Sequence, residues 1–97
     1  LFKNFEIFSF CSKMIIKKTE DFSNAFKDLP PEIKKLSQKQ EFIFKENWLD
    51  PRLHTKRIKE LPGIYSFRVT RRYRVLFYFR DRTAIFFTIG HRKDIYK

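Results

Sequence analysis

The chain has 97 residues, of which 42% are hydrophobic, 19% aromatic and 34% charged. Its length fits one domain with a modest core, and a composition of only two Gly and thirteen Phe excludes collagen-like and low-complexity chains. The net charge of +11 is concentrated: residues 1–50 carry nine Lys against eight acids, whereas residues 51–97 carry thirteen basic residues, nine of them Arg, against three acids. A guanidinium matches phosphate, so this arginine-rich half favours a polyanionic partner, most simply nucleic acid, over a merely soluble basic surface.

Cys11 is the sole cysteine, which excludes an internal disulfide. With only His54 and His91 besides, the chain has no zinc-finger spacing, and we expect no metal site. No apolar run approaches the roughly 20 residues that cross a bilayer. The apolar opening is broken by charges and has no small-residue cleavage site, so we expect no signal peptide and a cytoplasmic location.

The first readable element is a strand that begins with MIIKK at Met14. Residues 1–13 are either an upstream extension or misassigned start, or a segment whose phenylalanines pack as an extra helical turn or strand. We therefore treat residues 14–97 as a single domain and leave the status of residues 1–13 open.

Two helices should follow. Thr19, with two acids after it, predicts the N-cap of the first helix, which the pair Pro30-Pro31 ends. Pro31 suits the first position of a second helix that ends near Trp48, and so tight a connection predicts a helical hairpin. The positions expected to face the core are Phe22, Phe26 and Leu29 in the first helix and Ile33, Leu36, Gln40, Ile43 and finally Asn47 in the second, with Leu36 and Ile43 as the main anchors.

The periodicity changes after a basic connection, residues 51–63, that closes with Pro62-Gly63. Apolar and polar residues then alternate over residues 65–70, 73–80 and 83–89, which predicts three strands joined by short antiparallel turns. The expected fold class is α+β with the order β-α-α-β-β-β, a helical hairpin packed on a mainly antiparallel four-stranded sheet. The order of strands within the sheet stays open.

The apolar pattern also selects the register of the first hairpin. A turn at residues 70–72 pairs Phe67 with Val75 and Arg68 with Arg74, whereas a two-residue turn would place Arg68 opposite Val75 and mix the faces. Like charges directly across strands are destabilising. The two guanidinium groups therefore either stand in solvent or hold an anion between them, and we favour the anion.

The end of the chain, GHRKDIYK, adds further candidates. His91 is a candidate proton carrier, Arg92 brings a third guanidinium, and Tyr96 offers a ring for stacking and a hydroxyl. A lone histidine such as His54 is more often a surface residue than a ligand.

Three segments together, LDPRLHTKRIKELPGIYSFRV, RRYRVLFYF and GHRKDIY, make residues 14–97 resemble the RelE/ParE superfamily of bacterial type II toxins. The resemblance implies a small α+β fold with two N-terminal helices. RelE-like members are ribosome-dependent endoribonucleases that cut mRNA in the A site without metal or cofactor and leave a 2′,3′-cyclic phosphate. ParE-like members share the fold and poison DNA gyrase.

Carried onto this sequence, the resemblance implies catalytic roles for Arg68, Arg74, Arg92 and Tyr96. His91, which stands where some relatives have lysine, joins the expected catalytic set as a candidate proton carrier. Residues Lys56, Arg57, Lys59, Arg71 and Arg72 are expected to contact ribosomal RNA, the other interpretation being a solvated run of charges. No C-terminal helix is expected after the last strand. The implied partners are mRNA in the ribosome and an acidic antitoxin; the alternative functions are a ParE-like gyrase inhibitor, a non-catalytic basic binding module on the same fold, or a degenerate toxin.

Overall fold

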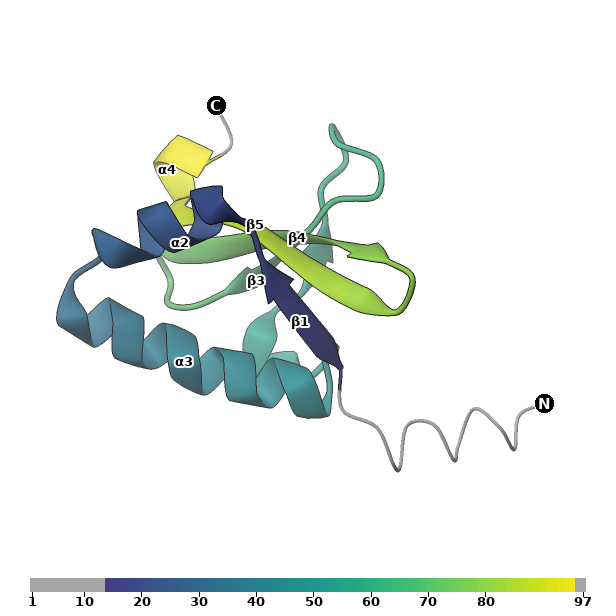
Figure 1. Cartoon of the computed structure of the whole chain (residues 1–97), viewed down its shortest axis with the longest axis horizontal. Coiled ribbons are helices and arrows are strands. Elements are labelled where there is room, and N and C mark those ends of the chain that lie inside the picture. The colour runs from purple at the N-terminus through teal and green to yellow at the C-terminus, as the bar shows by residue number, and fades with distance from the viewer. Residues whose placement is uncertain (1–13, 96–97) are drawn as a thin grey trace.

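The computed structural model describes residues 14–95, so residues 1–13 and Tyr96 lie outside the described part of the chain. Within it the elements follow the predicted order, with three additions, η1, β2 and α4 (Figure 1). Their bounds are β1 (Ile15–Lys18), α2 (Glu20–Lys27), α3 (Pro31–Glu46), a 3₁₀ turn η1 (Pro51–Leu53), β2 (Lys56–Arg57), β3 (Tyr65–Arg68), β4 (Tyr73–Arg80), β5 (Thr83–His91) and α4 (Arg92–Ile95).

The helical hairpin forms as its capping signals predict. The Thr19 Oγ1 accepts a hydrogen bond of 3.1 Å from the backbone N–H of Phe22, which satisfies one of the unpaired donors at the start of α2. α2 ends at Lys27, before the two prolines, and Pro31 occupies the first turn of α3, where its missing N–H costs nothing. The predicted end of the first helix and the predicted start of the second are both confirmed.

The sheet has the order β1-β5-β4-β3-β2, and only β1 pairs in parallel, with β5. The mainly antiparallel α+β fold is thus confirmed, but the sheet has five strands rather than the expected four. The additional strand is β2, in which Lys56 and Arg57 pair with Ser66 and Tyr65. Two exposed basic residues show no alternation, so the sequence pattern could not reveal this strand.

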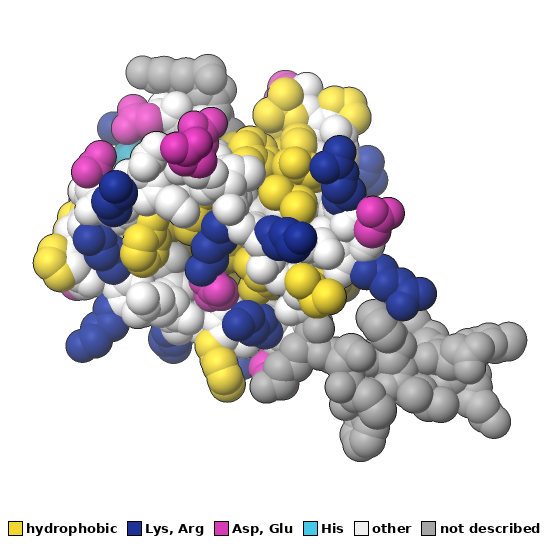
Figure 2. Space-filling view, viewed as in Figure 1, with side chains coloured by type: hydrophobic (Ala, Val, Ile, Leu, Met, Phe, Trp, Pro, Cys, Tyr) yellow, Lys and Arg dark blue, Asp and Glu magenta, His cyan; other side chains and the backbone are white. Residues whose placement is uncertain are grey.

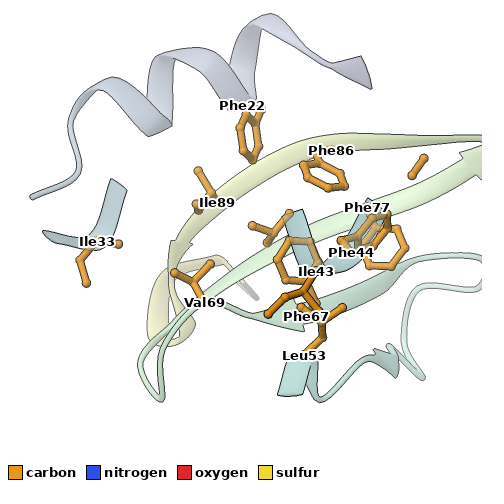
Figure 3. Close-up of a cluster of buried hydrophobic side chains, with 12 residues drawn as sticks. Phe22, Ile33, Ile43, Phe44, Leu53, Phe67, Val69, Phe77, Phe86 and Ile89 are labelled. Carbon is orange, nitrogen blue, oxygen red and sulfur yellow. The ribbon is translucent and has the colours of Figure 1, made fainter. Parts of the chain in front are cut away.

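The core lies between the helices and one face of the sheet (Figure 3). Phe44 is fully buried, and its ring centroid lies 5.0–5.2 Å from those of Phe67, Phe77 and Phe86. The prediction that Leu36 anchors α3 in the core is wrong, because its side chain is 38% exposed. The buried positions of α3 are Ile33, Ser37, Gln40, Ile43 and Phe44.

The face of α3 differs because three apolar residues in succession, residues 42–44, fit more than one helical stripe. The helix turns Phe44 inward and leaves Phe42 63% exposed. The Phe44 ring, packed against three other aromatic rings, contributes more to stability than the exposed Leu36 side chain does.

We predict that Phe44→Ala lowers the free energy of unfolding by about 3–5 kcal/mol, the cost of truncating a buried Phe. Phe42→Ala, on the same helix, should cost under about 1 kcal/mol because Phe42 is largely exposed. Urea denaturation measures both, and equal losses would contradict the assignment of the buried face.

Candidate functional site

The β3–β4 hairpin has the predicted register. Phe67 pairs with Val75, and Arg68 pairs with Arg74. The turn is closed by Thr70, whose Oγ1 accepts hydrogen bonds from the backbone N–H groups of Arg72 (3.1 Å) and Tyr73 (3.2 Å). Since side chains alternate along a strand, the apolar set faces the helices and the two arginines share the opposite face, here called the open face.

A β-bulge in β5 determines which residue of that strand lies beside Arg74. Counting back from the β4–β5 turn in regular register would place Ile89 opposite Arg74. The register shifts at Leu76/Phe77, where Phe87 of β5 is left without a partner, and Arg74 therefore pairs with Gly90. Arg68, Arg74 and Gly90 form a row across three neighbouring strands, which we call the arginine row.

The two arginine side chains of this row leave directly opposed backbone positions and are only partly solvated. Directly opposed residues have Cβ atoms about 4.5–5.5 Å apart. Both side chains are half-buried, and no carboxylate within residues 14–95 pairs with either of them. The Nε of Arg68 is buried and has no hydrogen-bond partner in the described part of the chain. A buried orphan donor beside a like charge is costly, and an anion bound at the row would offset that cost.

His91 lies apart from the arginine row. It pairs with Tyr73, the neighbour of Arg74 in the chain, so its strand position belongs to the opposite face. Its ring centroid is 5.6 Å from that of Tyr73, and its Nδ1 accepts a 3.2 Å hydrogen bond from the backbone N–H of Lys93. In the neutral ring the proton is therefore on Nε2.

The turn and the end of β5 are brought together by one backbone hydrogen bond. The N–H of Arg92 donates to the carbonyl of Arg72 over 2.7 Å. Arg71, Arg72 and Arg92 are all exposed at this end of the sheet. Three further cations thus stand beside the arginine row, whereas Tyr96 lies outside the described residues.

A short helix covers the end of the row, contrary to the expectation that no C-terminal helix follows. A Cβ built on Gly90 would lie 2.9 Å from the Cγ2 of Ile95 in α4, so a larger residue fits there only if Ile95 moves. Because Gly90 is in register with Arg74, this contact places Ile95 on the open face. Figure 1 shows α4 on the side of the sheet opposite α3.

The residues predicted to contact ribosomal RNA do not all lie on one face of the sheet. Lys56 pairs with Ser66, which shares the face of Arg68, whereas Arg57 pairs with Tyr65 on the helix side. Lys59 is exposed in the segment between β2 and β3, which rises on the same side of the sheet as α4 (Figure 1). On the face of the molecule that Figure 2 shows, Lys and Arg are interspersed with Asp and Glu. The open-face positions of β3 and β4 include no acidic residue.

Arg52 is already occupied by an acidic partner. Its Nε and Nη2 donate to Oδ1 (3.0 Å) and Oδ2 (2.9 Å) of Asp50 in a bidentate pair. These side-chain hydrogen bonds, followed by one from the Arg52 backbone N–H, lower the pKa of Asp50 from 3.8 to about 2. Arg52 is thereby distinguished from the two arginines of the row.

Residues 14–95 contain no cluster of three or more His, Cys, Asp or Glu side chains suited to a metal ion. None of the helices in this part of the chain is long and apolar enough to span a membrane.

The solved structures that share this fold include three toxins. RelE in the RelB–RelE antitoxin–toxin complex from Methanococcus jannaschii aligns with a TM-score of 0.69 and 25% identity, covering 84% of this chain and 95% of that chain. YafQ in the E. coli DinJ–YafQ toxin–antitoxin complex aligns with a TM-score of 0.71 and 12% identity, over 88% and 99% of the two chains. The Staphylococcus aureus YoeB dimer gives 0.68 and 15%, over 82% and 98%.

No protein-family model matches the sequence, and neither does any curated protein. The structural matches nevertheless agree with one another, since all three are with RelE-like toxins. The chain has the fold of the RelE-like toxins, as the hairpin and tail motifs predict.

The pKa of Asp50 offers a test of the Arg52 pair. In Arg52→Gln we expect this pKa to rise from about 2 towards 3.8, because the bidentate hydrogen bonds are lost. A lowered folded-state pKa means that the pair stabilises the fold above pH 3.8 and that this contribution disappears as the pH falls through about 2. Carboxyl-carbon NMR titration measures the shift. Lys39→Gln, with the same charge loss, should leave it unchanged.

Gly90→Ala should displace α4. The new methyl group overlaps Ile95, and a four-residue terminal helix yields more easily than β5, so we expect faster amide exchange over residues 92–95 and little change in β4. In the Ile95→Ala background the same substitution should add no further exchange, because the overlapping methyl is gone. Equal effects of Gly90→Ala in both backgrounds would contradict the contact.

Proposed function

We propose that this chain is the toxin of a type II toxin–antitoxin system and a ribosome-dependent mRNA endoribonuclease. The observation that carries the proposal is the half-buried pair Arg68 and Arg74, which has no acidic partner within residues 14–95. The RelE-like fold supports the toxin class. A gyrase inhibitor binds a protein surface. It would not require two neighbouring arginines on one strand face that have no acidic partner.

The chemistry needs little from the protein beyond orientation and charge. RNA supplies its own nucleophile, the 2′-hydroxyl, which attacks the adjacent phosphorus while the 5′-oxygen leaves, giving a 2′,3′-cyclic phosphate. Arg68 and Arg74 neutralise the charge that develops on the phosphate oxygens, and Arg92 supplies a third donor at the end of the row. Loss of one such preorganised donor costs about 2.7–4 kcal/mol in the barrier.

Two groups are proposed for proton transfer, His91 and Tyr96. His91 would act through Nε2, since its Nδ1 accepts from the Lys93 backbone. Its strand position faces away from the arginine row, so it must work from the end of β5. Tyr96 follows Ile95, the residue that covers Gly90, and is the second candidate, for proton transfer or for stacking on a base.

The proposed substrate is mRNA held in the ribosomal A site. A site of several cations binds phosphate without fixing the 2′-hydroxyl in line, so a larger structure must hold the strand, and we expect weak cleavage of free RNA. Lys56, Arg57, Lys59, Arg71 and Arg72 would contact ribosomal RNA. Each of these five is exposed.

The proposed partner is an acidic, partly helical antitoxin that covers the open face. M. jannaschii RelE and E. coli YafQ were crystallised with RelB and DinJ. An acidic segment would neutralise the same guanidinium groups that bind RNA, and its affinity should fall with salt.

The arginine row is tested by single substitutions. We expect Arg74→Ala or Arg68→Ala to slow ribosome-dependent cleavage by roughly 10²–10³-fold, as for a removed oxyanion donor. Arg92→Ala should reduce it too. Arg80→Ala removes the same charge from the exposed end of β4 and should retain near-normal activity.

Primer extension on mRNA incubated with purified ribosomes gives the rates. Equal cleavage by wild type, Arg74→Ala and Arg92→Ala would remove the arginine row from the mechanism. DNA-damage signalling in cells without mRNA cleavage would instead indicate a gyrase inhibitor on this fold.

A further inference from the structure

We propose that Gln40 is a positioning residue that holds Arg68 in place for catalysis, an inference that rests on the proposed ribonuclease function. Gln40 lies on the buried face of α3, only 8% exposed, among residues that are mostly apolar. A buried amide is costly unless its polar groups are hydrogen-bonded, so a glutamine at this position calls for a reason.

The amide of Gln40 joins two segments that otherwise belong to different parts of the fold. Its Nε2 donates to the backbone carbonyl of Arg68 over 2.8 Å and to that of Arg52 over 3.1 Å. Both acceptors are carbonyl oxygens, so only the NH₂ end of the side chain can serve them, and the orientation of the amide is settled. One side chain therefore ties α3 to the end of β3 and to η1.

The hydrogen bond from Gln40 reaches Arg68 at the last residue of β3. Phe67 and Val69, the chain neighbours of Arg68, are buried towards the helices. The packing of Phe67 and Val69 and the hydrogen bond to the Arg68 carbonyl together fix the Arg68 backbone from the helix side. The Arg68 side chain extends from the open face.

The buried Nε of Arg68 points to the same role. A buried donor without a partner persists only where the surrounding structure determines its position. A preorganised site must hold its charged groups to within about 0.5 Å, and misplacement by about 1 Å can cost on the order of 10²-fold in rate. Gln40 supplies this constraint from beneath the sheet without reaching the phosphate.

The test is Gln40→Met, which keeps the length of the side chain and removes both donors. We expect kcat for ribosome-dependent cleavage to fall at least 10-fold while KM for programmed ribosomes changes less than threefold. The matched control is Thr55→Val, which removes another side-chain bond to the backbone, from Thr55 Oγ1 to the Trp48 carbonyl at 2.7 Å. It should lower thermal stability and leave kcat unchanged.

A second measurement does not depend on activity. In Gln40→Met the NMR order parameter of the Arg68 backbone amide should drop from about 0.85 towards 0.6, whereas in Thr55→Val it should stay high. Gln40→Asn, one methylene shorter, serves if the methionine variant does not fold, and its kcat should fall in the same direction.

Unchanged kcat and an unchanged order parameter in folded Gln40 variants would overturn the positioning role. Absence of cleavage by the wild type would overturn the ribonuclease, and the order parameter would still decide whether Gln40 fixes Arg68.

Discussion

The length of the β3–β4 turn determines which side chains meet on each face of the sheet. With Thr70 closing the turn through two hydrogen bonds, Phe67 and Val75 point into the core and Arg68 and Arg74 point away from it. A shift of one residue would bury an arginine among phenylalanine rings, at a cost the domain could not sustain. The hydrophobic core thus holds the two cations together, although their mutual repulsion opposes it.

The aromatic core and the arginines of the proposed site are divided between the two faces of one sheet. The helix side contains the aromatic cluster around Phe44, whereas the open face contains the half-buried Arg68 and Arg74 and is partly covered by the short α4. Gln40 is the exception, because it belongs to the helix layer and bonds the backbone beneath the charged face. Substitutions of exposed basic residues, such as Lys56 and Arg80, should therefore have little effect on folding.

Much of this arrangement follows from the sequence because its signals are local. Caps and prolines mark the helices, and period-two alternation fixes the β3–β4 register and with it the Arg68–Arg74 pair. The bulge at Phe87 has no such signal, so Gly90 and the face of His91 could not be placed. The two-residue β2, the short α4 and the choice between stripes on α3 depend on tertiary packing, which periodicity does not report.

The parallel pairing of β1 with β5 has a consequence for biosynthesis. Ile15 lies opposite Thr83, so the first strand of the described chain finds its neighbour only when the last one has been made. Contacts this distant in sequence form late. The sheet cannot be completed until β5 has left the ribosomal exit tunnel. The guanidinium groups on β3 and β4 thus acquire their glycine neighbour only after β5 has been made.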